Sequence, residues 1–279
     1  MELSQVARGQ RRISVSSWSL HRTLGSPKIY GVEQGFHVPN EAQHKGQVTL
    51  LALPARLAAF GITTLEICHF HLPSLDRGYL AEVRSALQAA QIELFSLLID
   101  EGDLTHPQHA EHDQAWIEHW LEIAADLGAR RARVIAGKSV SEDALSRSAQ
   151  ALRYLAGRAE SLGLRLMTEN WFALLSQPQA VHTLFDQLEQ RVGLCLDFGN
   201  WKGPDKYRRL ASIAGYAESC HAKAHFFVPD QFDQEDYVRC LALTHEAHFA
   251  GPYTLIYDGP DPDEWHGLTL ERAIVQQYL

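Results

Sequence analysis

Side chains that can bind a metal ion or move a proton recur at the ends of four consecutive strand-like runs in the second half of the chain. Glu169 ends the run LRLMTE, Asp197 ends VGLCLD, His221 lies within SCHAKAHFF, and Asp258 follows TLIY. Parallel strands of a barrel present their carboxyl ends at one face, so these side chains would form a ring of oxygen and nitrogen ligands. With no cysteine among them, the ring suits one divalent ion: Mn²⁺, Mg²⁺, Co²⁺ or Zn²⁺.

Each of these residues also has a purely structural interpretation. Glu169 could cap the following helix or pair with Lys223, and His221 could be a hydrogen-bonded strand histidine. Asp197 precedes Phe-Gly-Asn and Asp258 precedes Gly-Pro, and both sequences are typical of turns. The hypothesis of a metal site therefore depends on the recurrence of a ligand-type residue at the same structural position.

The elements expected to carry these residues alternate between short β-rich runs and longer helical patterns. The strand-like runs cover residues 12–17, 62–68, 92–99, 132–137, 164–170, 192–200, 219–227 and 253–259. A helical pattern follows each run, and Ser139 and Glu142 have capping-box spacing before the fourth helix. The alternation predicts an α/β fold, a single (β/α)8 TIM barrel over residues 12–279 with a long loop after its first strand. Residues 1–11 are polar and predict a poorly ordered lead-in.

The composition restricts the classes of function. The chain of 279 residues is 46% hydrophobic, and 25 Lys and Arg against 34 Asp and Glu give a formal charge of −9. A nucleic-acid partner is disfavoured because it requires a basic face, and no glycine-rich phosphate loop follows a strand-like run. The chain has no apolar signal segment and no apolar stretch near the roughly 18 residues that cross a bilayer. We therefore expect a soluble cytoplasmic protein without a membrane partner.

Several segments together resemble a known superfamily. LRLMTENW, VGLCLDFGNW, CHAKAHFF and GPYTLIYDGP, with GITTLEICHFHLPS earlier in the chain, resemble the xylose isomerase-like TIM-barrel superfamily, specifically its sugar phosphate isomerase/epimerase group. In that group Glu, Asp, His and Glu from strands five to eight hold a divalent metal, and the two glutamates move a proton at a carbon next to a carbonyl. The resemblance implies an isomerase or epimerase of carbohydrate metabolism, and it implies a homo-oligomer, since barrels of this kind are often dimers or tetramers.

Carried over residue by residue, the resemblance implies that Glu169, Asp197 and His221 are metal ligands and that Glu169 is the catalytic base. Lys223 matches a lysine that commonly follows the histidine by two positions, and it is a candidate acid. The second glutamate of the group falls on Ile256. Because side chains alternate along a strand, Asp258 is expected to face the same side as position 256. Asp258 would then act either as a displaced metal ligand and catalytic acid or only as a turn residue.

Other polar and aromatic residues near strand ends are candidate substrate contacts. They are Trp18, Glu66, His69, His71, Trp171, Asn200 and His225. The loop over residues 22–47, which follows His21 and contains His37 and His44, is predicted to close over the substrate.

The preferred interpretation is a metal-dependent isomerase or epimerase that removes a proton next to the carbonyl of a small keto-sugar or polyol. Ile256 gives weight to a lyase or dehydratase on a related sugar, because elimination needs only one good base and a metal. Ile256 also leaves open a metal-free barrel that binds a small molecule or regulates a partner. The remaining alternative is a hydrolase like the apurinic-site endonucleases, which the negative net charge disfavours.

Overall fold

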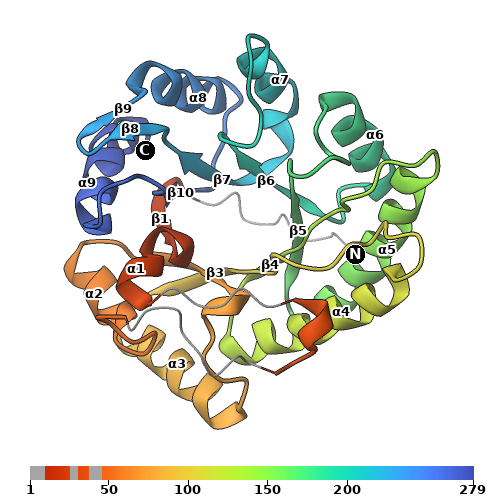
Figure 1. Ribbon diagram of the computed structural model, residues 1–279, viewed down its shortest axis with the longest axis horizontal. Coiled ribbons are helices and arrows are strands. Elements are labelled where there is room, and N and C mark those ends of the chain that lie inside the picture. The colour runs from red at the N-terminus through yellow and green to blue at the C-terminus, as the bar shows by residue number, and fades with distance from the viewer. Residues whose placement is uncertain (1–9, 26–30, 38–45) are drawn as a thin grey trace, which may run out of the picture.

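The computed structural model describes residues 10–25, 31–37 and 46–279. Eight parallel strands close into a barrel in the order β1-β10-β7-β6-β5-β4-β3-β2 (Figure 1). This confirms the predicted (β/α)8 TIM barrel. The barrel strands are β1 (Arg12–Ser16), β2 (Thr64–Cys68), β3 (Glu93–Leu98), β4 (Arg131–Arg133), β5 (Arg165–Glu169), β6 (Gly193–Asp197), β7 (Ala217–Lys223) and β10 (Pro252–Ile256).

Helices surround the barrel in chain order (Figure 1). They bury apolar faces against the strands, as α4 does with Trp116, Trp120 and Leu121. The α-helices are α1 (His21–Leu24), α2 (Leu53–Ala59), α3 (Arg77–Ala89), α4 (Ala110–Leu127), α5 (Ala144–Ser161), α6 (Pro178–Leu188), α7 (Lys206–Ile213), α8 (Gln234–Glu246) and α9 (Glu264–Val275). Short 3₁₀ turns are η1 (Ser17–Leu20), η2 (Val32–Gln34), η3 (His69–His71), η4 (Ala214–Tyr216) and η5 (Gln276–Tyr278).

Two predicted elements differ in detail from the structure. The capping box before α5 is absent: Asp143 is the N-cap, and the Ser139 hydroxyl instead donates to Asp103 Oδ2 at 3.2 Å. The single strand predicted over residues 219–227 is divided into β7 and β8 (Phe226–Val228). Because β8 pairs with β9 (Gln231–Phe232) in a separate antiparallel hairpin, it lies outside the barrel sheet.

Two segments predicted to lie outside the regular barrel are only partly described. Residues 1–9 of the lead-in, and residues 26–30 and 38–45 of the long loop with His44, lie outside the described residues. Arg11 is described, and its Nε donates to the carbonyl of Phe249 at 2.7 Å. The described part of the loop around η2 lies beside α4 (Figure 1), where Trp116 Nε1 donates to the carbonyl of Gly35 at 2.9 Å.

The amino-terminal end of the barrel is closed by packing and ion pairs. Phe95, Met167 and Cys195 form a small buried cluster among the strands. The guanidinium groups of Arg12 and Arg131 lie 5.5 and 4.5 Å from the centroid of the Phe95 ring. Arg12 also pairs with Glu93. Filled in this way, this end leaves the carboxyl ends of the strands as the open face.

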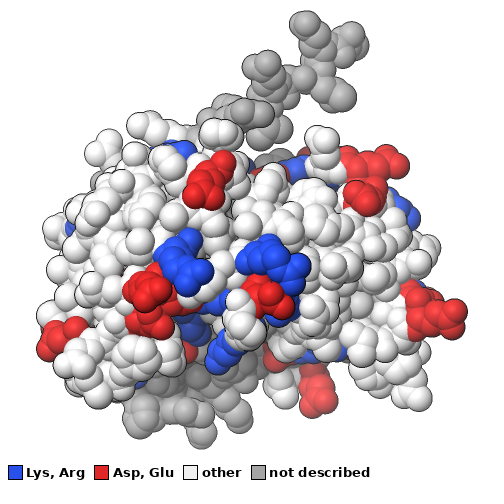
Figure 2. Space-filling view, turned by 90° about the horizontal axis from the view of Figure 1, so that it is seen from above, with Lys and Arg blue, Asp and Glu red and all other residues white. Residues whose placement is uncertain are grey.

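The described surface carries mixed charges. On the face shown in Figure 2, Lys and Arg side chains lie beside Asp and Glu side chains. That face therefore offers no extended basic stripe of the kind that follows a nucleic-acid backbone. None of the helices formed by the described residues is long and apolar enough to cross a membrane.

Candidate active site

A pocket of about 350 Å³ opens at the carboxyl ends of the barrel strands, and we call it the central pocket. This position and size are typical of small-molecule sites in TIM barrels. The central pocket is lined by Ser16, Trp18, Cys68, Phe70, Leu98, Asp100, Glu101, Arg133, Glu169, Trp171, Phe172, Asp197, Asn200, His221, Lys223 and Ile256.

Glu169, Asp197 and His221 come together at this pocket. Nδ1 of His221 lies 3.8 Å from Glu169 Oε2 and 3.7 Å from Asp197 Oδ2. None of the three side chains is more than 6% exposed. Glu169 and Asp197 are the last residues of β5 and β6, so the barrel itself brings their carboxylates to the imidazole.

The Asp-Phe-Gly-Asn turn after β6 fixes the carboxylate of Asp197. Its Oδ1 accepts from the backbone N–H groups of Gly199 at 2.5 Å and Asn200 at 2.8 Å, while Oδ2 faces His221. Gly199 is also required for space, because a Cβ there would lie 2.9 Å from Cδ of Lys223. The turn therefore sets the positions of both Asp197 and Lys223.

Two asparagines hold the ends of β5 and β6 together. The amide of Asn170 donates to the carbonyl of Asp197 at 3.1 Å and accepts from the N–H of Asp197 at 2.8 Å. This pair of bonds continues the strand pairing past Glu169. Asn200 Nδ2 donates to Glu169 Oε1 at 2.7 Å, which leaves Oε2 as the oxygen of Glu169 that faces His221.

Glu66 orients the imidazole of His221 from below. Its Oε2 lies 2.9 Å from Nε2 of His221, and its carboxylate is 0% exposed. A carboxylate partner places the ring proton on Nε2 and leaves the Nδ1 lone pair for the Glu169 and Asp197 side, the arrangement common for metal-ligating histidines. Glu66 was predicted as a substrate contact. The structure does not bring it to the central pocket, because it is buried beneath His221.

The sequence interpretation missed Arg133 and Asp100. Arg133 is 3% exposed, and its guanidinium joins two carboxylates: Nη2 lies 2.6 Å from Asp100 Oδ1, and Nε lies 3.1 Å from Glu169 Oε2. In the sequence, Arg133 belongs to the short basic run ARRAR. The signal that could have identified it is strand alternation, since an arginine on the inward face of a barrel strand needs a buried partner.

Burial and neighbouring charges shift the pKa values of the cluster in opposite directions. Burial raises the pKa of Glu169, and the charges of Arg133 and His221 only partly oppose this. Burial would also raise the pKa of Asp197, but the hydrogen bond and charge of His221 lower it below its ordinary value. Burial would lower the pKa of His221, yet the nearby Cys195 and Glu66 raise it well above its ordinary value. Glu169 is therefore the carboxylate of the pair that more readily takes up a proton.

The residues of the pocket fit a divalent cation. Four largely buried carboxylates surround the guanidinium of Arg133 and the imidazole of His221, so the cluster carries a net negative charge that a bound cation would offset. The carboxylates are Glu66, Asp100, Glu169 and Asp197. Oε2 of Glu169 is buried, and beside its ion pair with Arg133 it makes no hydrogen bond among the described residues. Ligand-type atoms of Glu169, Cys195 and His221 lie within 4.8 Å of one another, and no second group of this kind occurs in the described part of the chain.

Ile256 and Asp258 face different cavities. β10 ends at Ile256, whose side chain lines the central pocket at the position where the resemblance expects a glutamate. Strand alternation does not extend to Asp258, because Tyr257 already leaves the sheet and its N–H donates to the hydroxyl of Ser19 at 2.9 Å. The carboxylate of Asp258 is 44% exposed and lies 3.0 Å from Nζ of Lys223. The structure thus pairs Asp258 with Lys223 and does not place it with the three metal-ligand candidates.

The candidate substrate contacts divide into two groups. Trp18, Trp171 and Asn200 line the central pocket, whereas His69 and His71 do not. His69 is 0% exposed and packs against the rings of α4, and its Nδ1 accepts from the N–H of Asp100 at 3.2 Å. His71 is 8% exposed, and burial lowers its pKa to about 3. Both histidines are therefore buried and do not contribute to the lining of the central pocket.

The lining of the central pocket is one-sided. Its carboxylates are Asp100, Glu101, Glu169 and Asp197, which follow or end β3, β5 and β6. Strands β10, β1 and β2, neighbours in the closed barrel, contribute no carboxylate to the lining. Their lining residues are Ile256, Ser16, Trp18, Cys68 and Phe70.

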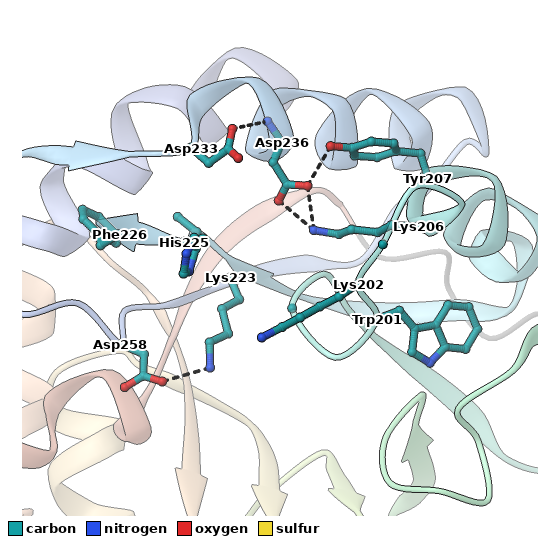
Figure 3. A pocket seen from close by; sticks show the side chains of 13 residues that line it. Trp201, Lys202, Lys206, Tyr207, Lys223, His225, Phe226, Asp233, Asp236 and Asp258 are labelled. Atoms are coloured by element: carbon teal, nitrogen blue, oxygen red, sulfur yellow. Dashed lines mark hydrogen bonds and ion pairs between the residues drawn. The ribbon is translucent and has the colours of Figure 1, made fainter. Parts of the chain in front are cut away.

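A second cavity of about 500 Å³, the adjoining pocket, is shown in Figure 3. It shares Lys223 with the central pocket. His225, predicted as a substrate contact, lines this cavity and not the central pocket, because it lies beyond the end of β7. The adjoining pocket is lined by Gly199, Trp201, Lys202, Gly203, Lys206, Tyr207, Lys223, Ala224, His225, Phe226, Asp233, Asp236 and Asp258.

Comparison with known proteins gives a family and a set of shared folds. The family model described as xylose isomerase-like TIM barrel matches residues 54–267. No curated protein sequence matches the chain.

Solved structures share the fold at low sequence identity. D-allulose 3-epimerase from Methylomonas sp. is 15% identical, with 97% of this chain and 99% of that chain covered and a TM-score of 0.69. The probable 3-DHS dehydratase AsbF from Bacillus anthracis is 11% identical, with 95% and 98% covered and a TM-score of 0.67. A xylose isomerase-like TIM barrel protein from Mycobacterium smegmatis in complex with magnesium is 14% identical, with 91% and 97% covered and a TM-score of 0.61.

Proposed function

The chain belongs to the xylose isomerase-like TIM barrel family, and on that premise we propose that it is a metal-dependent enzyme that removes a proton next to the carbonyl of a small polyhydroxylated substrate. The observation that carries the proposal is the convergence of Glu169, Asp197 and His221 in a 350 Å³ pocket at the carboxyl ends of the strands. The magnesium of the Mycobacterium smegmatis structure supports a divalent ion in a barrel of this fold.

Glu169, Asp197 and His221 would hold the ion, which when bound supplies a Lewis acid for the substrate carbonyl and the neighbouring hydroxyl. Glu169 is the proposed base, because its raised pKa matches a group that must accept a proton from carbon. Arg133 keeps this buried carboxylate in position through the 3.1 Å contact with Oε2. Trp18 and Trp171 offer aromatic faces to a sugar-like ring.

The one-sided lining favours proton removal and return on a single face of the substrate. Epimerisation by two bases needs a second proton-transfer group on the opposite face, where β10, β1 and β2 present Ile256, Ser16 and Trp18. Aldose–ketose isomerisation can use one base on one face, and elimination of a β-substituent also needs only one base. Elimination is the second candidate function, and Ile256 is the residue that favours it.

Proton exchange in D₂O tests the proposal. The chelated protein would be reloaded with Mn²⁺, Mg²⁺ or Co²⁺ and incubated with a panel of aldoses, ketoses and inososes, and NMR would record deuterium next to the carbonyl. We expect exchange that requires the metal and is lost in Glu169→Gln, while Glu142→Gln, a change outside the pocket, keeps it. Absence of metal binding together with absence of exchange would instead support a metal-free binding protein.

Metal titration of Ile256→Glu tests whether the native chain binds a metal ion through three ligands or binds none because the fourth ligand is missing. If the native chain holds a single ion through three residues, Ile256→Glu raises the affinity for Mn²⁺ by about tenfold or more, the effect expected of an added carboxylate ligand. If Ile256→Glu binds Mn²⁺ and the native chain does not, the metal part of the proposal fails. An apurinic-site endonuclease is not favoured, because the described residues contain one group of potential ligands and the net charge is −9.

A further inference from the structure

The adjoining pocket meets the central pocket at Lys223, and this junction defines a longer site than a monosaccharide needs. The two cavities measure about 350 and 500 Å³. Lys223 starts at the end of β7, and its side chain is 32% exposed. In Figure 3 the side chain extends toward Asp258, and the amine of Lys202 points into the same open space.

We propose that the adjoining pocket is a second substrate subsite. It holds a neutral, sugar-like group that is joined through oxygen to the carbon β to the substrate carbonyl, and Lys223 protonates that oxygen as the C–O bond breaks. This inference rests on the function proposed above and names its substrate class: an O-linked keto-sugar.

The charges of the adjoining pocket favour a neutral polyol over a phosphate. Lys206 is paired with both oxygens of Asp236 at 2.7 Å, and Lys223 is paired with Asp258 at 3.0 Å. Lys202 and Asp233 complete the set, so the lining carries as many lysines as aspartates. Paired charges of this kind present both donors and acceptors to hydroxyl groups, and they leave no net positive charge for a dianion.

Aromatic side chains supply the remaining surface of the subsite. The adjoining pocket is lined by Trp201 from the β6–α7 connection, Tyr207 from the first turn of α7 and Phe226 from the start of β8. Trp201 is held by its Nε1, which donates to the carbonyl of Leu175 at 3.1 Å, and Tyr207 by its hydroxyl, which donates to Asp236 at 2.9 Å. Aromatic faces next to fixed polar groups are typical of sugar-binding sites.

Among the residues that line the two cavities in the described chain, Lys223 is the only one common to both. In the elimination, Glu169 takes the proton from the carbon next to the carbonyl, and a C=C bond forms as the β C–O bond breaks. The electron pair of that bond stays on the departing oxygen, which takes a proton from Lys223. The products are an unsaturated keto-sugar and a free alcohol. Glu169 then releases its proton to water and Lys223 takes one up, so the protons balance and no oxidant or reductant is needed.

The test compares two synthetic keto-hexoses, one with a free hydroxyl and one with an O-linked glucosyl group at the β carbon. The metal-loaded full chain would be incubated with each in D₂O, and NMR would record α-deuteration and glucose release separately. We expect glucose release by the native protein. We expect Lys223→Met to slow release by about 100-fold, the contribution typical of a general acid, while α-deuteration changes far less.

Two further variants locate the subsite. Lys202→Ala should lower the preference for the glucosyl compound over its single-unit counterpart by about tenfold, the value of one lost polar contact. The matched control is Arg208→Ala, which removes an exposed basic side chain from α7 outside the pocket and should change neither rate. Circular dichroism and thermal unfolding would confirm that each variant folds, and Lys223→Gln replaces Lys223→Met if the latter does not.

The outcomes separate this inference from the proposed function. Deuteration of the single-unit compound without glucose release, or an equal loss of both reactions in Lys223→Met, overturns the second subsite and leaves the proposed function standing. Absence of deuteration in both compounds together with absence of glucose release overturns the proposed function, and the inference falls with it.

Discussion

The guanidinium of Arg133 neutralises two carboxylates that the barrel would otherwise bury without a counter-charge. Asp100 lies at 2.6 Å and Glu169 at 3.1 Å, and the three side chains are 12%, 5% and 3% exposed for Asp100, Glu169 and Arg133. Burial would raise the pKa of Asp100, but the charge of Arg133 lowers it below its ordinary value. Arg133 therefore stabilises the folded pocket as well as positioning the carboxylate of Glu169.

We predict that Arg133→Met lowers the free energy of unfolding by about 3–5 kcal/mol, because it removes the counter-charge of the buried Asp100 and leaves Glu169 with only Asn200 and His221. Urea unfolding at neutral pH measures the change. Arg133→Lys keeps the charge but loses the forked geometry, so its loss should be smaller. A loss below about 1 kcal/mol in Arg133→Met would mean that the carboxylates find water or another partner, and that Arg133 does not hold the pocket together.

His71 predicts a pH dependence of stability that can be assigned to one residue. Nδ1 of His71 lies 2.8 Å from Ser17 Oγ, which also accepts from the N–H of Cys68 at 2.9 Å. Burial lowers the pKa of His71 from its ordinary 6.5 to about 3. Between pH 3 and pH 6.5 the imidazole of His71 is protonated in the unfolded chain and neutral in the folded chain. The contribution of His71 to the free energy of unfolding is therefore complete above pH 6.5 and decreases as the pH falls toward 3.

At pH 5 this loss should be about 2 kcal/mol, at about 1.4 kcal/mol for each pH unit below the unfolded pKa. His71→Gln keeps an acceptor for Ser17 and cannot be protonated, so it should lose that part of the difference between urea unfolding at pH 7.5 and pH 5. His112→Gln is the control, since the side chain of His112 is 69% exposed. Equal pH dependence in the native chain and His71→Gln would show that other groups carry the acid sensitivity.

At the scale of elements, α9 fixes the loop that follows β1. The buried carboxylate of Glu264 accepts from the N–H groups of Arg22 and Thr23, both at 2.8 Å. The carbonyl of Thr23 accepts in turn from Gln47 and Val48 at 2.9 and 3.0 Å, so the two ends of the loop are joined. Glu264 thereby determines where this loop, predicted to close over the substrate, begins and ends.

We predict that Glu264→Ala increases the hydrogen exchange of the Arg22, Thr23 and Val48 amides and lowers the free energy of unfolding by about 1–3 kcal/mol, the cost of leaving buried N–H groups unpaired. Exchange followed by mass spectrometry measures the first effect. Glu235→Ala, which removes an 84% exposed carboxylate from α8, is the control. Unchanged exchange at these amides would mean that the loop is held by other contacts.

The sequence was sufficient to predict the elements whose signals are local. The eight barrel strands were predictable because short apolar runs alternate with helical patterns, and Glu169, Asp197 and His221 because they stand at or near strand ends. The pairing of Glu66 with His221 and of Arg133 with Asp100 joins distant strands, and no local pattern carries that information. Asp258 was placed on the face of Ile256 by extending β10, but the barrel closes its last strand at Ile256.

The reason that β10 stops is itself a packing effect. The ring of Tyr257 is buried between α9 and the chain that follows, and a Cβ at Gly267 would lie 2.1 Å from its Cε2. The Tyr257 hydroxyl donates to the carbonyl of Asp261 at 3.1 Å and fixes the turn. Asp258 is therefore carried out of the strand register and over to Lys223.

At the scale of the whole molecule, one end of the barrel provides stability and the other end carries the candidate site. The amino-terminal end is closed by the Phe95 ring beneath Arg12 and Arg131 and by the pairing of Arg165 with Glu218 at 2.7 Å. The carboxyl end carries the buried carboxylate of Glu169 and both cavities. This division is the one found in TIM barrels, where the loops after the strands carry chemistry and the opposite end carries stability.

We predict that Phe95→Ala lowers the free energy of unfolding by about 3–5 kcal/mol, because it leaves a cavity inside the closed end and removes the ring beneath two guanidinium groups. Phe95→Leu fills most of that volume and should cost about 1–2 kcal/mol. Neither change should alter hydrogen exchange of the Gly199 and Asn200 amides, which are bonded to Asp197 at the other end. Faster exchange at those two amides in Phe95→Ala would show that the ends are coupled, and that substitutions chosen for stability at the closed end would also disturb the carboxylates of the site.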